Sequence, residues 1–240
     1  MDLKNFTKHL IYQSANTQIP DNFSRFQILH PEYSAHESVV KTYPLPENEH
    51  LFSLLWDIHD GHMLSATILP SQPSFLYEKE FTPGIRTQMH SHEYLELFYI
   101  IDGEYRQKIL GNEFTFHRGE VCLIDKNCLH QDCLTDQSGV VLFIGIANDM
   151  FTEIMNENST PQKILSFLQS ALLKQKDVQQ FLHFRPSDGA SESLDDSLLL
   201  LLKESYSPDS GSRYITKGLL FRIFRILSTQ YDFSLSKEQK

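Results

Sequence analysis

The stretch GIRTQMHSHEYLELFYIIDG, from Gly84 to Gly103, places two histidines and a glutamate within seven residues. His90, His92 and Glu96 are separated by offsets of two and four. Side chains at even offsets point to the same face of a β-strand, whereas a helix would scatter them. Two neutral imidazoles and a carboxylate on one face can hold a divalent cation and leave positions open for water or ligand. The stretch therefore predicts a metal site or a polar pocket floor carried on a strand.

A fourth ligand is expected from a neighbouring strand, and His130, at the end of the run EVCLIDKNCLH, is the natural candidate. If metal is bound, the ligand set does not choose among Zn, Ni, Fe and Mn. Tyr94 and Phe98 have the same parity as the site residues, so we expect them to line the pocket or to pack in the core. Cys128 and Cys133 bracket His130, but no second pair completes a structural zinc site, and core cysteines are expected.

Charge and composition exclude several classes of protein. The 240 residues carry a net charge of −10 and contain no long run of Lys or Arg, so direct contact with duplex DNA is not expected. No apolar run suggests a signal peptide or a membrane span. Three clustered cysteines fit reduced thiols, and we expect a cytoplasmic protein without a membrane partner. Nucleophilic catalysis has no support, because a Gly-x-Ser-x-Gly elbow is absent from the sequence.

Residues 49–147 read as short strands separated by Gly, Asn and Asp, which predicts an antiparallel sandwich or barrel. Asp60-Gly61 stands between two apolar runs and predicts a tight hairpin turn. The expected strands include SFLYEKEF, YLELFYIID, EYRQKILGNEFTFH, EVCLIDK and GVVLFIGIA. The predicted fold is mainly β with C-terminal helices, an α+β arrangement.

The spacing of apolar residues changes after residue 147, and residues 148–232 are predicted to form a helical segment. Helices are expected through MFTEIMNE, KILSFLQSALLK, SLDDSLLLLLKESY and YITKGLLFRIFRILSTQ, with QQFLHF as a returning strand. In the last helix Ile215, Leu219, Ile223, Ile226 and Leu227 form one apolar stripe, and Phe221 and Phe224 fall outside it. A second apolar face predicts either a dimer interface at Phe221 and Phe224 or further burial within the monomer. Residues 1–48 are expected to be an irregular N-terminal arm, and residues 233–240 the start of a linker.

The site residues resemble the first cupin motif, in which Gly84, His90, His92, Glu96 and Gly103 occupy every fixed position. The second motif is matched more loosely by Gly119 and His130. At three positions this sequence departs from the usual pattern, with Asp125 in place of Pro, Asn127 in place of Gly and Leu134 in place of Asn. The resemblance implies a jelly-roll-like barrel with a site in its mouth.

More narrowly, the chain resembles the N-terminal sensor domain of AraC-type bacterial transcription regulators. The runs HSHEYLELFYIIDGEYRQKI, FTFHRGEVCLIDKNCLHQD and VVLFIGIANDMFTEIM carry this resemblance. It implies a small polar effector such as a sugar in the barrel mouth, a homodimer formed through the helices, and DNA contact through a segment missing from this chain. The alternative is a stand-alone metal-dependent cupin enzyme, a dioxygenase or an isomerase, because two His and a carboxylate suit non-haem iron.

Overall fold

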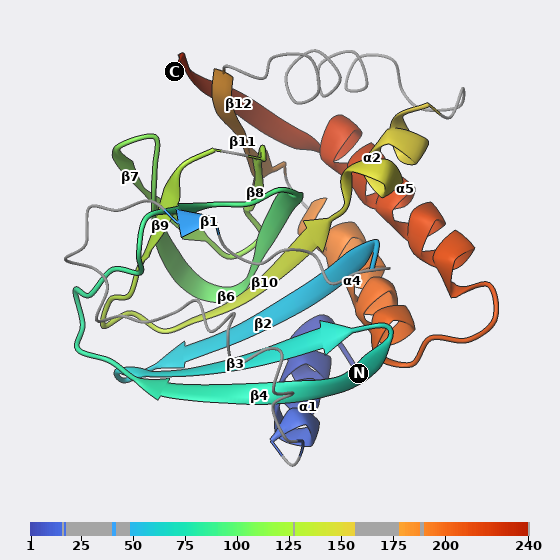
Figure 1. The fold of residues 1–240 in the computed structure, drawn as a ribbon, viewed down its shortest axis with the longest axis horizontal. Coiled ribbons are helices and arrows are strands. Elements are labelled where there is room, and N and C mark those ends of the chain that lie inside the picture. The colour runs from blue at the N-terminus through green and yellow to red at the C-terminus, as the bar shows by residue number, and fades with distance from the viewer. Residues whose placement is uncertain are drawn as a thin grey trace.

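A computed structural model describes residues 1–15, 17, 40–41, 49–126, 128–156, 178–187 and 190–239 (Figure 1). The first half of the chain contains α1 (Leu3–Ser14), β1 (Val40–Lys41), β2 (Leu51–His59), β3 (His62–Leu69), β4 (Gln72–Glu80), β5 (His90–Ser91), β6 (Leu95–Ile109) and β7 (Asn112–His117). The second half contains β8 (Val121–Ile124), β9 (His130–Cys133), β10 (Gly139–Ile146), α2 (Asn148–Met155), β11 (Val178–Pro186), α4 (Ala190–Tyr206), α5 (Ser212–Gln230) and β12 (Tyr231–Gln239). The predicted helix KILSFLQSALLK lies outside the described residues.

The strands form two layers joined by β6. The larger sheet has the order β4-β3-β2-β10-β6-β8-β11-β12, and all its pairs are antiparallel. The smaller sheet contains β1, β5, β9, the second half of β6 and β7, and only the short β1–β5 pair is parallel. The first half of β6 pairs with β8 and β10, and the second half pairs with β7 and β9. This is the predicted jelly-roll arrangement with C-terminal helices.

Two facing glycines allow β6 to bend from one sheet into the other. Gly103, at the bend, has φ +68° and lies opposite Gly139 of β10. A Cβ at Gly103 would collide with the carbonyl oxygen of Ser138, and one at Gly139 would collide with that of Glu104. Gly103 therefore needs both its freedom at positive φ and its lack of a side chain.

The turn predicted at Asp60-Gly61 is confirmed, because both residues have positive φ (46° and 77°) and they join β2 to β3. The run EYRQKILGNEFTFH is not one strand. Leu110 and Gly111, also at positive φ (49° and 78°), turn the chain between β6 and β7.

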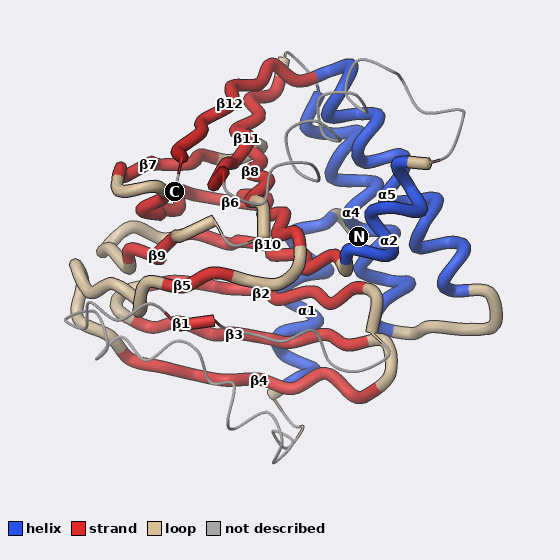
Figure 2. Tube along the Cα trace, turned by 45° about the horizontal axis from the view of Figure 1, so that its top comes forward, coloured by secondary structure: helices blue, strands red, loops and turns tan. Residues whose placement is uncertain are grey.

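The central strands of the larger sheet, among them β2, β8 and β10, are buried on both faces. Leu54, Trp56 and Ile58 of β2 face the barrel interior, and the alternate residues Leu51 and Leu55 face the helices. The helices gather on one side of the strands (Figure 2). Burial on both faces explains why these strands read as continuous apolar runs and not as strict alternation. Among the described residues we find no helix with the length and apolar character needed to span a membrane.

The structure differs from the expectation at both ends of the chain, although residues 18–39 and 42–48 of the expected arm lie outside the described residues. Residues 3–14 form α1, capped by the Asp2 side chain, and Leu3, Phe6 and Leu10 pack into the core between the helices and the larger sheet. Residues 231–239 form β12, paired along its whole length with β11, so residues 233–239 are not a linker.

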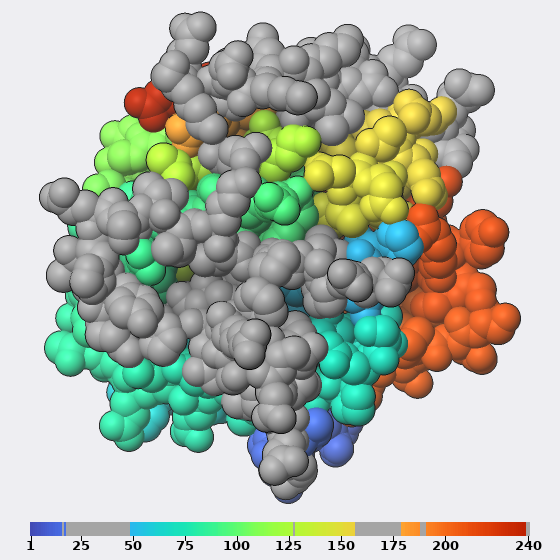
Figure 3. Space-filling model, viewed as in Figure 1, coloured from blue at the N-terminus to red at the C-terminus, as the bar shows by residue number. Residues whose placement is uncertain are grey.

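The α5 helix buries most of the predicted apolar stripe, because Ile223, Ile226 and Leu227 lie in the core, but it also buries Phe224 from outside that stripe. Phe224 is only 3% exposed and packs edge-on against Phe151 of α2, with ring centroids 5.6 Å apart. Phe221 is partly buried against the same core, whereas Ile215, assigned to the buried stripe, is 49% exposed. The prediction that Phe224 contacts a second subunit is therefore wrong, because the monomer already covers it. The outer surface of α5 forms the right-hand edge of the molecule in Figure 3.

Candidate functional site

The structure brings the four predicted ligand residues together at the meeting point of the two sheets. His90 lies on β5, directly opposite His130 of β9. Glu96 lies on the first half of β6, and His92 lies between these two strands. The stretch from His90 to Glu96 is therefore interrupted and not one continuous strand. Its side chains still converge, as the even spacing predicted.

The polar atoms of the four residues are within reach of one small ion. One ring nitrogen from each of His90, His92 and His130 can be chosen so that all three lie within 4.8 Å of one another. Nε2 of His92 is 3.1 Å from Nε2 of His130 and 2.9 Å from a carboxylate oxygen of Glu96. The other Glu96 oxygen is 3.7 Å from Nε2 of His130. Three imidazoles and a carboxylate in this arrangement can hold a divalent metal.

Two backbone carbonyl groups orient the imidazoles. Nδ1 of His90 donates to the carbonyl oxygen of Gln88 at 2.8 Å, and Nδ1 of His130 donates to that of Cys128 at 2.9 Å. These bonds place the proton on Nδ1 and leave the Nε2 lone pair of each ring free, as in the outer contacts of metal-bound histidines.

Burial keeps two of these imidazoles neutral. It lowers the pKa of His90, although the nearby Asp132 carboxylate acts in the opposite direction. It also lowers the pKa of His130 well below the ordinary value, and the neighbouring His90 and His92 add to this shift. Neutral imidazole is the form that binds metal.

Unsatisfied atoms show that the residues fit a metal ion. Oε1 of Glu96 is buried and accepts no hydrogen bond from the protein. Nε2 of His130 faces Nε2 of His92 with its lone pair, so at most one proton can lie between the two rings. A cation at this point would satisfy the free lone pairs together. The residues that would hold it are His90, His92, Glu96 and His130.

A second buried carboxyl group, which the sequence analysis missed, lies beside His90. Asp132 is 3% exposed and accepts hydrogen bonds from the Tyr105 hydroxyl, from Nε2 of Gln107 at 3.1 Å and from Oγ1 of Thr87 at 2.9 Å. Asp132 follows His130 by two residues and so shares its face of β9, which is the signal that could have revealed it. Glu96 and Asp132 are thus both buried near the imidazoles, and a divalent cation would offset their negative charge.

Tyr94 and Phe98 belong to the aromatic interior. The ring of Tyr94 stacks on His92 at 4.6 Å with an interplanar angle of 12°. Phe98 is fully buried and packs edge-on against Tyr105 and Phe116. Tyr94 therefore contacts the metal-site residues directly, whereas Phe98 is packed among other rings.

The strand that carries Glu96 also contacts the helices. Tyr99, three residues further along β6, points to the opposite face, where its hydroxyl donates to Oδ1 of Asp195 on α4 at 2.5 Å. Burial raises the pKa of Tyr99, and the Asp195 carboxylate raises it further. The site and the helical layer are thus joined through one strand.

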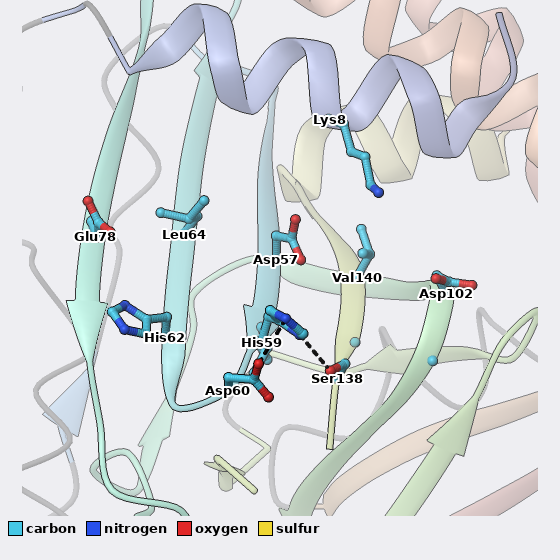
Figure 4. A pocket seen from close by; sticks show the side chains of 13 residues that line it. Lys8, Asp57, His59, Asp60, His62, Leu64, Glu78, Asp102, Ser138 and Val140 are labelled. Carbon is cyan, nitrogen blue, oxygen red and sulfur yellow. Dashed lines mark hydrogen bonds and ion pairs between the residues drawn. The ribbon is translucent and has the colours of Figure 1, made fainter. Parts of the chain in front are cut away.

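A groove of about 630 Å³ lies on the outer face of the larger sheet, beneath α1 (Figure 4). One row of paired residues crosses it, in the order Asp102, Val140, Asp57, Leu64 and Glu78. His59 and His62, on either side of the Asp60-Gly61 turn, also line it. Lys8 of α1 reaches over this row (Figure 4). This groove is separated from the histidine cluster by the sheet.

Comparison with known families gives a match over part of the barrel. Residues 77–144, which include all four candidate ligands, match the family described as "Cupin domain". The match covers less than a third of the 240 residues, and over this part the chain is similar to a cupin domain. A comparison with curated protein sequences finds no match.

Several solved structures resemble the chain at low identity. ToxT from Vibrio cholerae, with an unsaturated fatty acid bound, is 15% identical with a TM-score of 0.42, over 76% of this chain and 56% of that one. A cupin 2 conserved barrel domain protein from Salinispora arenicola is 17% identical with a TM-score of 0.27, over 46% of this chain and 76% of that one. The DMSP lyase DddQ from Ruegeria pomeroyi is 14% identical with a TM-score of 0.26, over 37% and 40%. The chain thus spans about half the length of ToxT, and no function follows from TM-scores this low.

Proposed function

We propose that this chain is the small-molecule-sensing and dimerising part of an AraC-type transcription regulator. DNA contact would be supplied by helix-turn-helix units outside these residues, which suits the net charge of −10. The observation that carries the proposal is the buried cluster of His90, His92, Glu96 and His130, in which Glu96 lies on β6, the strand that also contacts α4 through Tyr99. The small polar effector and the homodimer expected from the sequence remain part of the proposal.

Sensing requires that the effector bind two arrangements of the protein with different affinity. The hydrogen bond between Tyr99 and Asp195 supports such a coupling, because a displacement of β6 at Glu96 would alter the distance to α4. The α4 helix packs along α5, whose outer face is available to a second subunit. A change in the barrel would thereby alter the relative placement of two subunits.

The metal-binding part of the proposal is tested with Glu96→Gln. The variant keeps the size of the side chain but removes its charge, so we expect at least tenfold weaker binding of Zn²⁺ or Ni²⁺ in titration calorimetry. The melting temperature of the metal-free protein should change by no more than a few degrees. Glu80→Gln, at an exposed position on β4, is the matched control and should bind metal like the wild type. A large loss of stability without a change in metal affinity would make Glu96 a structural residue.

The second candidate function is a metal-dependent cupin enzyme, a dioxygenase or an isomerase. It is favoured by the same cluster, because three imidazoles and a carboxylate leave coordination positions open for oxygen or substrate. Element analysis of the purified protein, followed by an oxygen electrode measurement with Fe(II), separates the two. Stoichiometric iron together with oxygen consumption on a metabolite panel would overturn the regulator proposal. Metabolite-dependent sedimentation without turnover would support it.

A further inference from the structure

A cavity of about 400 Å³ lies where β7 of the smaller sheet faces β11 and β12 of the larger sheet. These strands lie at the same end of the molecule in both ribbon views (Figures 1 and 2). The volume is in the range of small-molecule sites. The side chains that point into the cavity therefore decide which kind of molecule it can bind.

The strand register shows which side chains these are. On the smaller sheet, Asn112 and Phe114 of β7 are two positions apart and share one face, and their partners on β6 are fully buried. On the larger sheet, Ser236 of β12 is paired with Phe181 of β11, so both side chains lie on one face. Glu238 is two positions further along β12 and lies on that same face. All five residues line the cavity.

Two phenylalanines, one from each sheet, form the apolar wall. The rings of Phe114 and Phe181 meet edge to face with centroids 5.2 Å apart. This contact joins the two sheets, so the face of the larger sheet that carries Phe181 is the one that borders the cavity. Leu182, the next residue, belongs instead to the core beneath the helices. An aromatic ring in contact with Phe114 and Phe181 would be removed from water on two sides.

Glu238 supplies the charge of this cavity. Of the described residues that line it, Lys237 and Glu238 are charged, and the alternation along β12 puts the Lys237 side chain on the opposite face. Burial raises the pKa of the Cys128 thiol in the barrel interior, and the Glu238 carboxylate adds to this shift, which agrees with an inward position of that carboxylate. Glu238 forms no ion pair with any residue in the described part of the chain. A cation on a ligand would therefore meet this carboxylate without displacing a partner.

Two neutral side chains of the same cavity favour a primary ammonium group over other cations. Nδ2 of Asn112 donates to the carbonyl oxygen of Leu110 at 3.2 Å, so Oδ1 of Asn112 remains as an acceptor. The hydroxyl oxygen of Ser236 is a second acceptor. A primary ammonium group has several N–H donors to offer, whereas a quaternary ammonium group has none. The aromatic wall adds a favourable surface for a positive charge.

We infer that this cavity binds a small primary amine with an aromatic body, whose ammonium group is held by Glu238 and whose ring packs against Phe114 and Phe181. The cavity lies outside the histidine cluster, so the inference goes beyond the proposed function, and binding does not depend on it. Ile109, which also lines the cavity, is paired with His130 on β9. In taking the amine as an effector that acts through this pair, and in this alone, the inference rests on the proposed function.

The test is titration calorimetry with phenethylamine, phenethyl alcohol and hydrocinnamate, which share a phenyl group and differ in charge. EDTA is present so that the amine cannot bind through a metal ion at the histidine cluster. We expect the amine to bind about fivefold more tightly than the alcohol, and the acid to bind most weakly. The reason is that the Glu238 carboxylate attracts the ammonium group and repels the carboxylate of the acid.

Two charge variants separate the neighbouring side chains of β12. Glu238→Gln should remove the preference for the amine over the alcohol and leave alcohol binding unchanged. Lys237→Gln, the matched control, should keep that preference, because the Lys237 side chain is on the other face of the strand. The inference is overturned if amine and alcohol bind the wild type equally, if neither binds at millimolar concentration, or if Glu238→Gln keeps the preference.

Phe114→Ala tests the wall, and should weaken the binding of amine and alcohol alike by about tenfold. A melting curve establishes that this variant is folded. If it is not, Phe114→Leu takes its place, with a smaller expected loss of about threefold. Unchanged binding in the folded variant would place the amine elsewhere and overturn the inference.

Failure here can be told apart from failure of the proposed function. Metal binding that depends on Glu96, without any binding of phenethylamine, would overturn the amine site alone. Amine binding that depends on Glu238 but leaves sedimentation unchanged would support the site and count against its role as an effector.

Discussion

The pH dependence of stability gives a direct test of the neutral imidazoles at the cluster. In the unfolded chain a histidine has a pKa near 6.5, whereas burial lowers the pKa of His90 and His130 in the folded protein. The folded state therefore takes up fewer protons than the unfolded state as the pH falls below 6.5. By linkage, the stability associated with these two groups is fully present above pH 6.5 and is lost as the pH falls towards their folded pKa values.

The size of the effect follows from proton uptake by the unfolded chain. A histidine whose folded pKa lies well below 5.5 loses about 1 kcal/mol of stability between pH 6.5 and pH 5.5. His90 and His130 together would account for about 2 kcal/mol if both remain neutral over this range. His130→Gln removes one of the two groups, so the difference in the loss between the variant and the wild type should be about 1 kcal/mol.

The assay is urea unfolding at the two pH values, with EDTA present to keep the protein free of metal. Comparing the variant with the wild type removes the contribution of titrating groups that do not interact with His130. His62→Gln, at a half-exposed position on β3, is the control and should keep the wild-type pH dependence. If His130→Gln loses as much stability as the wild type between pH 6.5 and 5.5, the reasoning about a buried neutral imidazole is refuted.

Three other predictions concern the carboxyl groups, the glycines and the helices. Burial raises the pKa of Asp125 to about 7, so the stability contributed by its protonated carboxyl group is lost as the pH rises from about 4 to 7. Because Asp125→Asn does not titrate, this variant should gain stability relative to the wild type over the same pH range in urea unfolding. Gly139→Ala should cost about 2–4 kcal/mol because its Cβ would collide with the backbone of β6, whereas Gly218→Ala, in open space on α5, should stabilise by about 1 kcal/mol in the same assay. If α5 pairs subunits, Tyr214→Glu, at an 80% exposed position, should lower the dimer fraction in sedimentation velocity with the fold retained. Phe224→Ala, at a buried position, should chiefly lower the free energy of unfolding, by about 3–5 kcal/mol. Equal unfolding free energies for the two glycine variants, or a Tyr214→Glu protein that sediments like the wild type, would contradict the last two.

The residues that the sequence predicted correctly depend on local rules. The even spacing of His90, His92 and Glu96 was enough to predict that their side chains meet, although the strand is broken between Ser91 and Leu95. Asp60-Gly61 predicted its turn because positive φ at two successive positions restricts the residue types. These features need no knowledge of distant parts of the chain.

Other features could not be predicted, because they arise from contacts between distant segments. Asp132 is buried by Tyr105 and Thr87, which are 27 and 45 positions away in sequence. The sequence of β12 is polar because β12 is an edge strand, with β11 on one side and solvent on the other. Only its pairing with β11 identifies it as a strand. For Phe224 the sequence left open a subunit contact or burial within the monomer, and packing against Phe151 decides for burial.

The α1 helix is a different case, because its apolar residues Leu3, Phe6, Leu10 and Ile11 have helical spacing that is visible in the sequence. Its N-cap, Asp2, is visible as well. The polar residues between them led to the prediction of an irregular arm.

The continuity of β6 has a mechanical consequence. Glu96 faces the barrel interior, and Tyr99, three residues further along β6, faces the helices. Glu96 is paired with His92, and Tyr99 donates a hydrogen bond to Asp195. In the function proposed above, β6 is the element that would carry a displacement of Glu96 to Asp195 on α4.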